Sequence, residues 1–218
     1  MRNRLSTIYN GYDPEAAPSA RPLPAREHKL IVHAGTIYHG RNPDLLMEGL
    51  ARLRARGVPE ALGVKVLLLG PTLKLAEANW ALYGRAEQQG WLQLQETVPR
   101  PEAQKIVEQA DALLIVQPHT TVQIPGKLFE YICVGRPVMA IVPRSSPIEM
   151  ILQKSELPHV CLYPDDPPEA ADEKIVRFLR LPSTPTPINN WFRTNFSGEV
   201  QAEALARIVG EAAGKAHM

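Results

Sequence analysis

The chain has 218 residues, of which 44% are hydrophobic and 22% charged, and its formal net charge is +1. This length can bury a proper core in one large domain or two small ones. The near-neutral charge, without a basic block, argues against nucleic-acid binding, and no apolar run approaches the ~18 residues of a membrane span.

Short apolar runs alternate with helical patterns from residue 29 to residue 181. Runs that are apolar throughout are typical of strands in a parallel sheet covered on both faces. We therefore predict a doubly wound, Rossmann-like α/β domain with about six strands. Strands are expected at residues 29–35, 64–70, 91–98, 112–118, 137–142 and 159–163; helices at 42–57, 73–90, 100–111, 127–134, 146–155 and 167–181.

The two ends of the chain do not follow this alternation. Residues 1–27 are expected to form a short apolar strand and a Pro/Ala-rich linker, and residues 182–218 a second linker with a final amphipathic helix from about residue 198 to residue 213. The domain proper is placed at residues 28–181. Trp191, Phe192 and Phe196, in the second linker, are expected to form an exposed aromatic patch and a contact between two copies of the chain.

The N-terminus has no apolar segment of the kind found in signal peptides. The only cysteines, Cys133 and Cys161, lie in apolar surroundings and are interpreted as buried free thiols rather than a disulfide or a metal site. These features predict a cytoplasmic protein.

In open parallel sheets, ligands bind beyond the carboxyl ends of the strands, and three loops fit that location. In the first, Gly35 lets the backbone approach a ligand, and Arg41 can reach an anion at the following helix N-terminus. A tight turn with a surface arginine is the alternative. In the second loop, the backbone at Val98 can contact a planar base. The alternative is an ordinary strand-to-helix loop.

The third loop follows the fourth strand and carries Thr120 and Thr121. Gly126 can turn backbone amides toward a ligand, and Lys127 adds positive charge at the positive end of a helix, which suits a diphosphate better than it suits the helix dipole. Glu130 can accept two hydrogen bonds from a ribose diol. Its alternative role is a favourable charge in the first helical turn.

Several stretches, in this order and spacing, resemble the C-terminal, donor-binding half of GT-B-fold glycosyltransferases of the group 1 (family 4) class. They are TIYNGYDPE, LIVHAGTIYHGRNPDLLMEGLARL, VKVLLLG, VEQADALLIV and IPGKLFEYICVGRPVMAIV. The resemblance as a whole covers nearly the whole chain. The most specific part is Lys-Leu-Phe-Glu-Tyr followed by Gly-Arg-Pro. The resemblance implies that the chain is one half of a GT-B fold and binds a nucleotide-sugar, UDP- or GDP-linked, without a further cofactor or metal.

The resemblance also implies site residues. Glu130 matches the carboxylate that binds the ribose, Gly126, Lys127 and the adjoining Leu128 stand where backbone amides meet the diphosphate, and Val98 stands at the base. The remaining donor-side positions are Gly35 and Thr36 beneath the phosphates and Arg41 near the basic clamp, where the usual Arg and Lys pair is incomplete. No catalytic residue is assigned.

The sequence departs from the family in two respects. Val122 stands where the first glutamate of the family's Glu-x7-Glu motif lies, so Thr120 or Thr121 is expected to replace that contact, and retention or inversion of configuration stays open. The acceptor-binding N-terminal domain, toward which residues 182–218 would pack, is not part of the sequence. We therefore expect the isolated chain to be inactive and its parent enzyme to be cytoplasmic, with attachment to the inner membrane through the missing domain left open.

Two alternatives remain from the sequence. One is a stand-alone nucleotide-binding or interaction module, favoured by the missing glutamate. The other is a sugar-nucleotide epimerase of similar two-domain architecture, which would need acidic and histidine groups around the sugar that the sequence does not reveal.

Overall fold

A six-stranded parallel sheet forms the centre of the computed structural model, which describes residues 6–37, 40–71 and 80–215. Its strand order is β3-β2-β1-β4-β5-β6, the order of a doubly wound fold, which confirms the predicted class. The strands are β1 (Lys29–Ala34), β2 (Val64–Leu69), β3 (Leu92–Gln95), β4 (Ala112–Val116), β5 (Val138–Ile141) and β6 (His159–Leu162).

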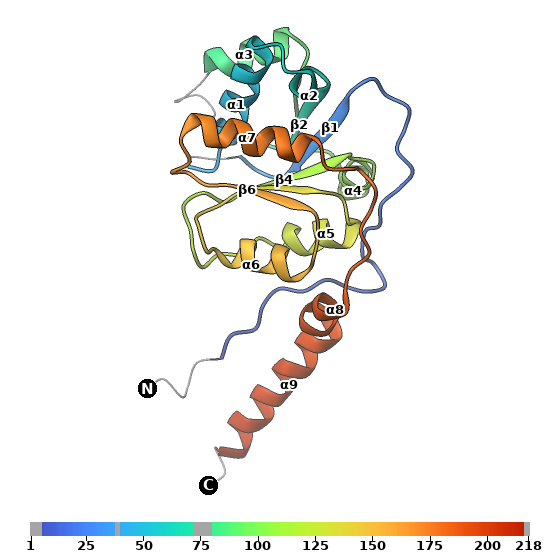
Figure 1. The fold of residues 1–218 in the computed structure, drawn as a ribbon. Helices are drawn as coiled ribbons and strands as arrows, with labels where there is room; N and C mark the ends of the chain where they lie inside the picture. Colours follow the sequence, from blue (N-terminus) through green and yellow to red (C-terminus); the bar gives the residue numbers. More distant parts are fainter. Residues whose placement is uncertain (1–5, 38–39, 72–79, 216–218) are drawn as a thin grey trace.

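Helices cover both faces of this sheet (Figure 1). The inner strands have apolar side chains on both faces, and β4 is buried along its whole length, because each face is packed against helices. One layer contains α1 (Asp44–Ala55), α2 (Pro59–Leu62), α3 (Trp80–Gln88) and α7 (Pro168–Leu179); the other contains α4 (Arg100–Glu108), α5 (Lys127–Val134), α6 (Pro147–Lys154) and α8 (Asn190–Phe196).

Local sequence signals set several of the helix ends. Ser146 accepts a hydrogen bond of 3.2 Å from the backbone amide of Glu149 and so caps the start of α6. Gly135 ends α5 in the left-handed conformation, with φ of 75°. Of the helix expected at residues 73–90, the part from Trp80 is observed, and residues 72–79 lie outside the described residues.

The strand expected near the N-terminus is not formed. Residues 6–28 lack regular structure apart from an isolated bridge between Tyr12 and Ser197. Scattered backbone hydrogen bonds, such as that from the Arg21 amide to the Glu108 carbonyl at 2.9 Å, and side-chain contacts fasten this segment to the domain. Arg21 forms an ion pair with the buried carboxylate of Glu108 at the end of α4, and Arg26 donates to the Gln109 carbonyl at 2.8 Å.

The second linker was also predicted incorrectly, because part of it forms the short helix α8. Asn189 caps this helix by accepting a 2.9 Å hydrogen bond from the amide of Phe192. Phe192 and Phe196 are buried rather than exposed, since Phe192 stacks on Tyr12 with 5.2 Å between ring centroids and both pack on α5. Two of the three side chains of the predicted exposed patch are therefore buried, and Trp191 is half-buried. The two phenylalanine rings join the ends of the chain to the domain.

Both linkers meet at the turn between α5 and β5. The buried Arg136 donates to the backbone carbonyls of Arg21 (2.7 Å) and Ser183, and Thr186 donates its amide to the Gly135 carbonyl at 2.8 Å. Beyond α8, the helix α9 (Gly198–Lys215) extends away from the domain, and Leu205 and Val209 on it are exposed (Figure 1).

Candidate functional site

The strand order reverses between β1 and β4, which pair directly with each other at the centre of the sheet. A ligand of an open α/β sheet binds beyond the carboxyl ends of the strands at such a point. The loops after β1 and β4 are the first and third loops that the sequence singles out. They touch each other: a Cβ added to Gly40 would lie 3.0 Å from the His119 ring, and Arg41 donates a hydrogen bond to Gln123.

The N-terminal half of α5 is attached to the end of β1 by two of its side chains. The Lys127 ammonium donates to the Ala34 carbonyl at 2.7 Å, and the Tyr131 hydroxyl accepts from the Ala34 amide at 3.0 Å. Residues four apart on a helix share a face, so both side chains reach the same peptide. The Ala34 carbonyl is therefore a structural partner of Lys127, and it accounts for a lysine at this helix end, which capping does not.

Gly35 is required where Lys127 crosses the end of β1. A Cβ at this position would lie 2.0 Å from the Lys127 ammonium nitrogen, and the backbone has a φ of 146° that side-chain-bearing residues rarely adopt. The glycine therefore leaves room for the lysine amine at this edge of the sheet.

Burial changes the protonation of two neighbouring groups here. It lowers the pKa of Lys127 to about 8; Glu130 opposes this shift, and Arg41 adds to it. Burial, together with the Lys127 charge, also lowers the pKa of His33 to about 3, although its Nδ1 contacts the Leu114 carbonyl at 2.9 Å. The end of β1 therefore carries a buried neutral histidine, and beside it lies an ammonium that can lose its proton near pH 8.

A cavity of about 760 Å³ opens beside these groups. Its volume falls in the range typical of small-molecule sites, roughly 300–1,000 Å³. Gly126, Lys127 and Glu130 line it, as the sequence predicts for a single ligand site. The rest of the lining comes from the N-terminal segment, the end of β1, α4 and α5: Asn10, Gly11, Tyr12, Asp13, Ala16, Ala17, Pro18, Ala34, Arg100, Ala103, Gln104, Val107 and Tyr131.

The Glu130 side chain is half-exposed and available to a ligand. Its partner is Arg100 at the start of α4, with 3.7 Å between guanidinium and carboxylate, and the Arg100 side chain is 89% exposed. Such an exposed pair is weak, so it leaves both groups able to turn toward a ligand.

At the N-terminus of α5, the backbone does only part of what was expected. No side chain caps this end, and the amides of Gly126 and Lys127 have no backbone acceptor among the described residues. Leu128 is different, because its side chain is fully buried and its amide donates to the Pro125 carbonyl at 3.0 Å. The structure thus places Leu128 in the core and leaves Gly126 and Lys127 toward the cavity.

The other predicted site residues lie around the edge of the site rather than in its cavity. The Thr120 hydroxyl accepts from the amides of Val122 (3.3 Å) and Gln123 (3.2 Å), so it shapes its own loop. Thr36 and Thr121 are exposed. Val98 is half-buried against the core beneath α4 and does not line the cavity.

Sequence reasoning did not select several polar groups that the fold brings here. Arg100 was assigned only to a helix start, and Gln117 and Gln123 were not noted at all. The stretch containing Tyr12 and Asp13 was matched to the family but not placed at the cavity. For Arg100, the one available signal was its position in the second of the three carboxyl-end loops.

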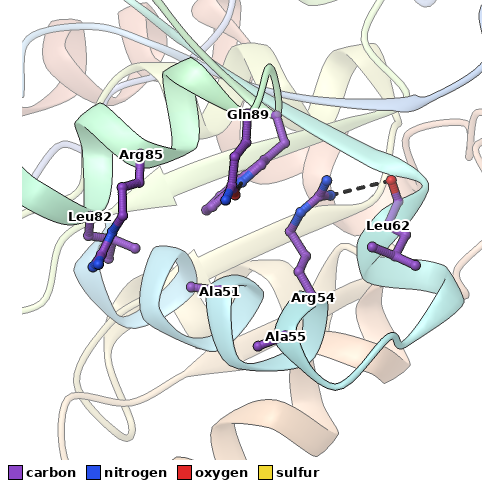
Figure 2. A pocket seen from close by; sticks show the side chains of 8 residues that line it. Ala51, Arg54, Ala55, Leu62, Leu82, Arg85 and Gln89 are labelled. Carbon is purple, nitrogen blue, oxygen red and sulfur yellow. Dashed lines mark hydrogen bonds between the residues drawn. The ribbon is translucent and has the colours of Figure 1, made fainter.

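A second cavity, of about 490 Å³, lies near the amino ends of the strands, between α1, α2 and α3 (Figure 2). Arg54 crosses it and donates hydrogen bonds to the carbonyls of Ala61 (2.6 Å) and Leu62 (3.3 Å). These bonds supply a donor to carbonyl groups at the C-terminal end of α2. Its guanidinium also lies 5.3 Å from the centre of the Trp91 ring. These contacts give Arg54 a structural role.

Within residues 6–37, 40–71 and 80–215, no helix is long and apolar enough to cross a membrane. The same residues contain no cluster of three or more His, Cys, Asp or Glu side chains suited to a metal ion. Cys133 and Cys161 are free thiols, as predicted, and burial raises the pKa of each to about 12.

No protein-family profile matches the sequence, and no curated protein matches it either. Solved structures do match. Anabaena HepE in complex with UDP and glucose aligns with a TM-score of 0.66 at 15% identity, over 93% of this chain and 56% of that one. HepE in complex with UDP-glucose aligns with a TM-score of 0.60 at 14% identity, over 94% of this chain and 57% of that one.

A third structure is similar over the same extent. AviGT4, a glycosyltransferase involved in avilamycin A biosynthesis, aligns with a TM-score of 0.55 at 16% identity, over 95% of this chain and 58% of that one. The chain therefore has the fold of one half of these GT-B glycosyltransferases, and it spans little more than half of their length.

Proposed function

We propose that this chain is the donor-binding domain of a glycosyltransferase that takes a sugar from a nucleoside diphosphate, with UDP as the favoured carrier. The observation that supports it is the convergence of Gly126, Lys127 and Glu130 on one 760 Å³ cavity at the switch point of the sheet. Solved structures of the same fold were determined with UDP and with UDP-glucose, which motivates the choice of nucleotide.

Each group in the site has a physical role in this proposal. The two acceptor oxygens of Glu130 receive the hydrogens of the ribose diol. The open amides at the start of α5, together with Lys127, bind the diphosphate at the positive end of the helix dipole. Arg41, in the loop across the switch point, approaches the same phosphates with a planar fork of donors.

The chemistry that follows is electrostatic stabilisation of the leaving group. When the sugar–phosphate bond breaks, negative charge grows on the diphosphate, and donors already in place stabilise it more than they stabilise the substrate. Lys127, Arg41 and the helix N-terminus supply this positive charge, so we propose that transfer proceeds without a metal ion. We also propose a cytoplasmic location for the parent enzyme, where nucleotide-sugars are available.

Calorimetric titration of the chain with UDP, GDP, ADP and uridine tests the proposal. UDP is expected to bind, with equal affinity in EDTA and in Mg²⁺. Glu130→Ala should weaken UDP binding about 10- to 100-fold, because it removes hydrogen bonds to a charged acceptor. Glu87→Ala, which removes an exposed helical carboxylate far from the cavity, should leave binding unchanged. Absence of heat with all three diphosphates would overturn the proposal.

We further propose that a separate acceptor-binding domain completes the enzyme. Catalysis between two substrates requires both to be positioned, and the chain spans 56% of the first matched structure. The chain alone is therefore expected to transfer no sugar from UDP-glucose to water or to simple glycosides. Transfer by this chain in a radiolabel assay would refute that expectation without affecting nucleotide binding.

A further inference from the structure

The loop after β4 contains two glutamines that connect it to the rest of the site. Gln117 follows β4 directly and is almost completely buried, and its backbone amide continues the ladder by donating to the Ile141 carbonyl at 2.8 Å. Its side-chain amide nitrogen donates to the Gln123 side-chain oxygen at 3.3 Å. A group fixed in the sheet thus orients an exposed group on the loop.

The Gln123 oxygen receives a second hydrogen bond, from the guanidinium of Arg41 in the loop after β1. One carbonyl oxygen has two lone pairs and can accept both. Gln117, Gln123 and Arg41 therefore form a continuous chain of hydrogen bonds from the buried strand β4, across the switch point, to the cation of the opposite loop.

We propose that Gln123 is a positioning residue that holds Arg41 over the diphosphate half of the donor site. This inference rests on the proposed function. The neighbouring Val122, at the position where the resemblance to the GT-B class places a glutamate, is 84% exposed and has no side-chain donor or acceptor to offer Arg41. Position 123 therefore supplies a polar connection between the two loops.

The neutral amide matters as much as the hydrogen bond. A carboxylate at position 123 would also accept from Arg41, but it would add a negative charge next to the place where the diphosphate binds. An amide orients the guanidinium without adding that charge. The site is thereby one unit more positive than it would be with a glutamate in this loop, which favours an anionic ligand.

Two substitutions separate position from charge. Gln123→Ala removes the acceptor and should weaken UDP binding about threefold to tenfold, the usual effect of one hydrogen bond. Gln123→Glu retains the acceptor and adds a charge, so UDP affinity should fall about tenfold and recover partly in high salt. Uridine, which has no phosphates, should bind all variants equally. Gln153→Glu, an exposed change of the same type on α6, is the matched control.

A double-mutant cycle shows whether Gln123 acts through Arg41. In an Arg41→Ala background, Gln123→Ala should have no further effect on UDP affinity. If Gln123→Ala weakens UDP binding as much in that background as in the unmodified chain, the positioning role is overturned. Equal losses of affinity for UDP and uridine would also overturn it. So would Gln123 variants that bind UDP as tightly as the Gln153→Glu control. If the unmodified chain binds no UDP, the proposed function fails and this inference fails with it. Binding by the unmodified chain, with unaffected Gln123 variants, overturns this inference alone.

Discussion

Lys127 gives donor binding a pH dependence that can be worked out from the structure. Burial lowers the pKa of its ammonium from 10.5 to about 8 in the free chain. A diphosphate bound at the start of α5 would place negative charge beside this group and raise its pKa again. Binding of UDP is therefore coupled to proton uptake above about pH 8, and affinity must fall as the pH rises through that value.

The size of the effect follows from the pKa change. Lowering the pKa from 10.5 to about 8 corresponds to about 3 kcal/mol between the two protonation states. If a bound diphosphate restores about half of this, UDP binding weakens roughly tenfold between about pH 7.5 and about pH 9.5. The phosphates of UDP contribute little in this interval, because their last ionisation lies near pH 6.

Calorimetry in two buffers with different ionisation enthalpies measures the proton uptake directly. The chain should take up a fraction of a proton per UDP at about pH 8.5 and almost none at about pH 7, as the pKa requires. Lys127→Met should reduce both the uptake and the pH dependence to the level shown by uridine, whose uracil ring titrates by itself toward the upper end of this range. Equal uptake by the chain and by Lys127→Met, or no uptake by either at the higher pH, would refute the assignment of the ammonium to the diphosphate.

Two further predictions concern stability. Burial lowers the pKa of His33 to about 3, so the unfolded chain binds more protons between about pH 6.5 and about pH 3, and stability falls as the pH falls. Urea unfolding should show that the free energy of unfolding of the unmodified chain falls by about 2 kcal/mol as the pH is lowered to about 5, and by less in His33→Gln. Equal losses in the two proteins would contradict this. Gly135→Ala would place a Cβ 2.3 Å from the Thr186 carbonyl at a φ of 75°, whereas Gly57→Ala, at 70°, meets nothing. Gly57→Ala should lower the free energy of unfolding by about 1 kcal/mol, and Gly135→Ala should lower it by at least twice as much. Similar losses for the two variants would show that the linker at Thr186 moves freely.

The sheet could be predicted from sequence because its signals are local. Apolar runs such as residues 112–116 can be buried on both faces only in a sheet with two helical layers, and their alternation with helices leaves few topologies. The short helix α8 was missed although Asn189 signals its start, because the proline-rich stretch before it indicated a linker. Only tertiary packing on Tyr12 and Phe129 shows that its phenylalanines are buried.

The site was predictable only where one segment supplies several groups. Gly126, Lys127 and Glu130 lie within one helical turn, so their common location follows from the sequence. The contacts of Arg41 with Gln123 and of Glu130 with Arg100 join residues distant in the chain, through exposed side chains whose orientation no local pattern determines. The same holds for the N-terminal wall of the cavity, which depends on where α8 places Tyr12.

The bond between Lys127 and the Ala34 carbonyl changes how the lysine is understood. From the sequence, a cation at the positive end of a helix indicated an anionic ligand, because the dipole alone disfavours it. The structure shows that a purely structural role is sufficient, since the ammonium and Tyr131 together attach α5 to β1. These roles differ in what they predict: a structural lysine changes the free energy of unfolding but leaves UDP binding independent of pH, whereas a lysine that also meets the diphosphate couples binding to a proton. Both roles remain open to Lys127, because Gly35 leaves room for the amine at the end of β1 and the lysine also lines the cavity.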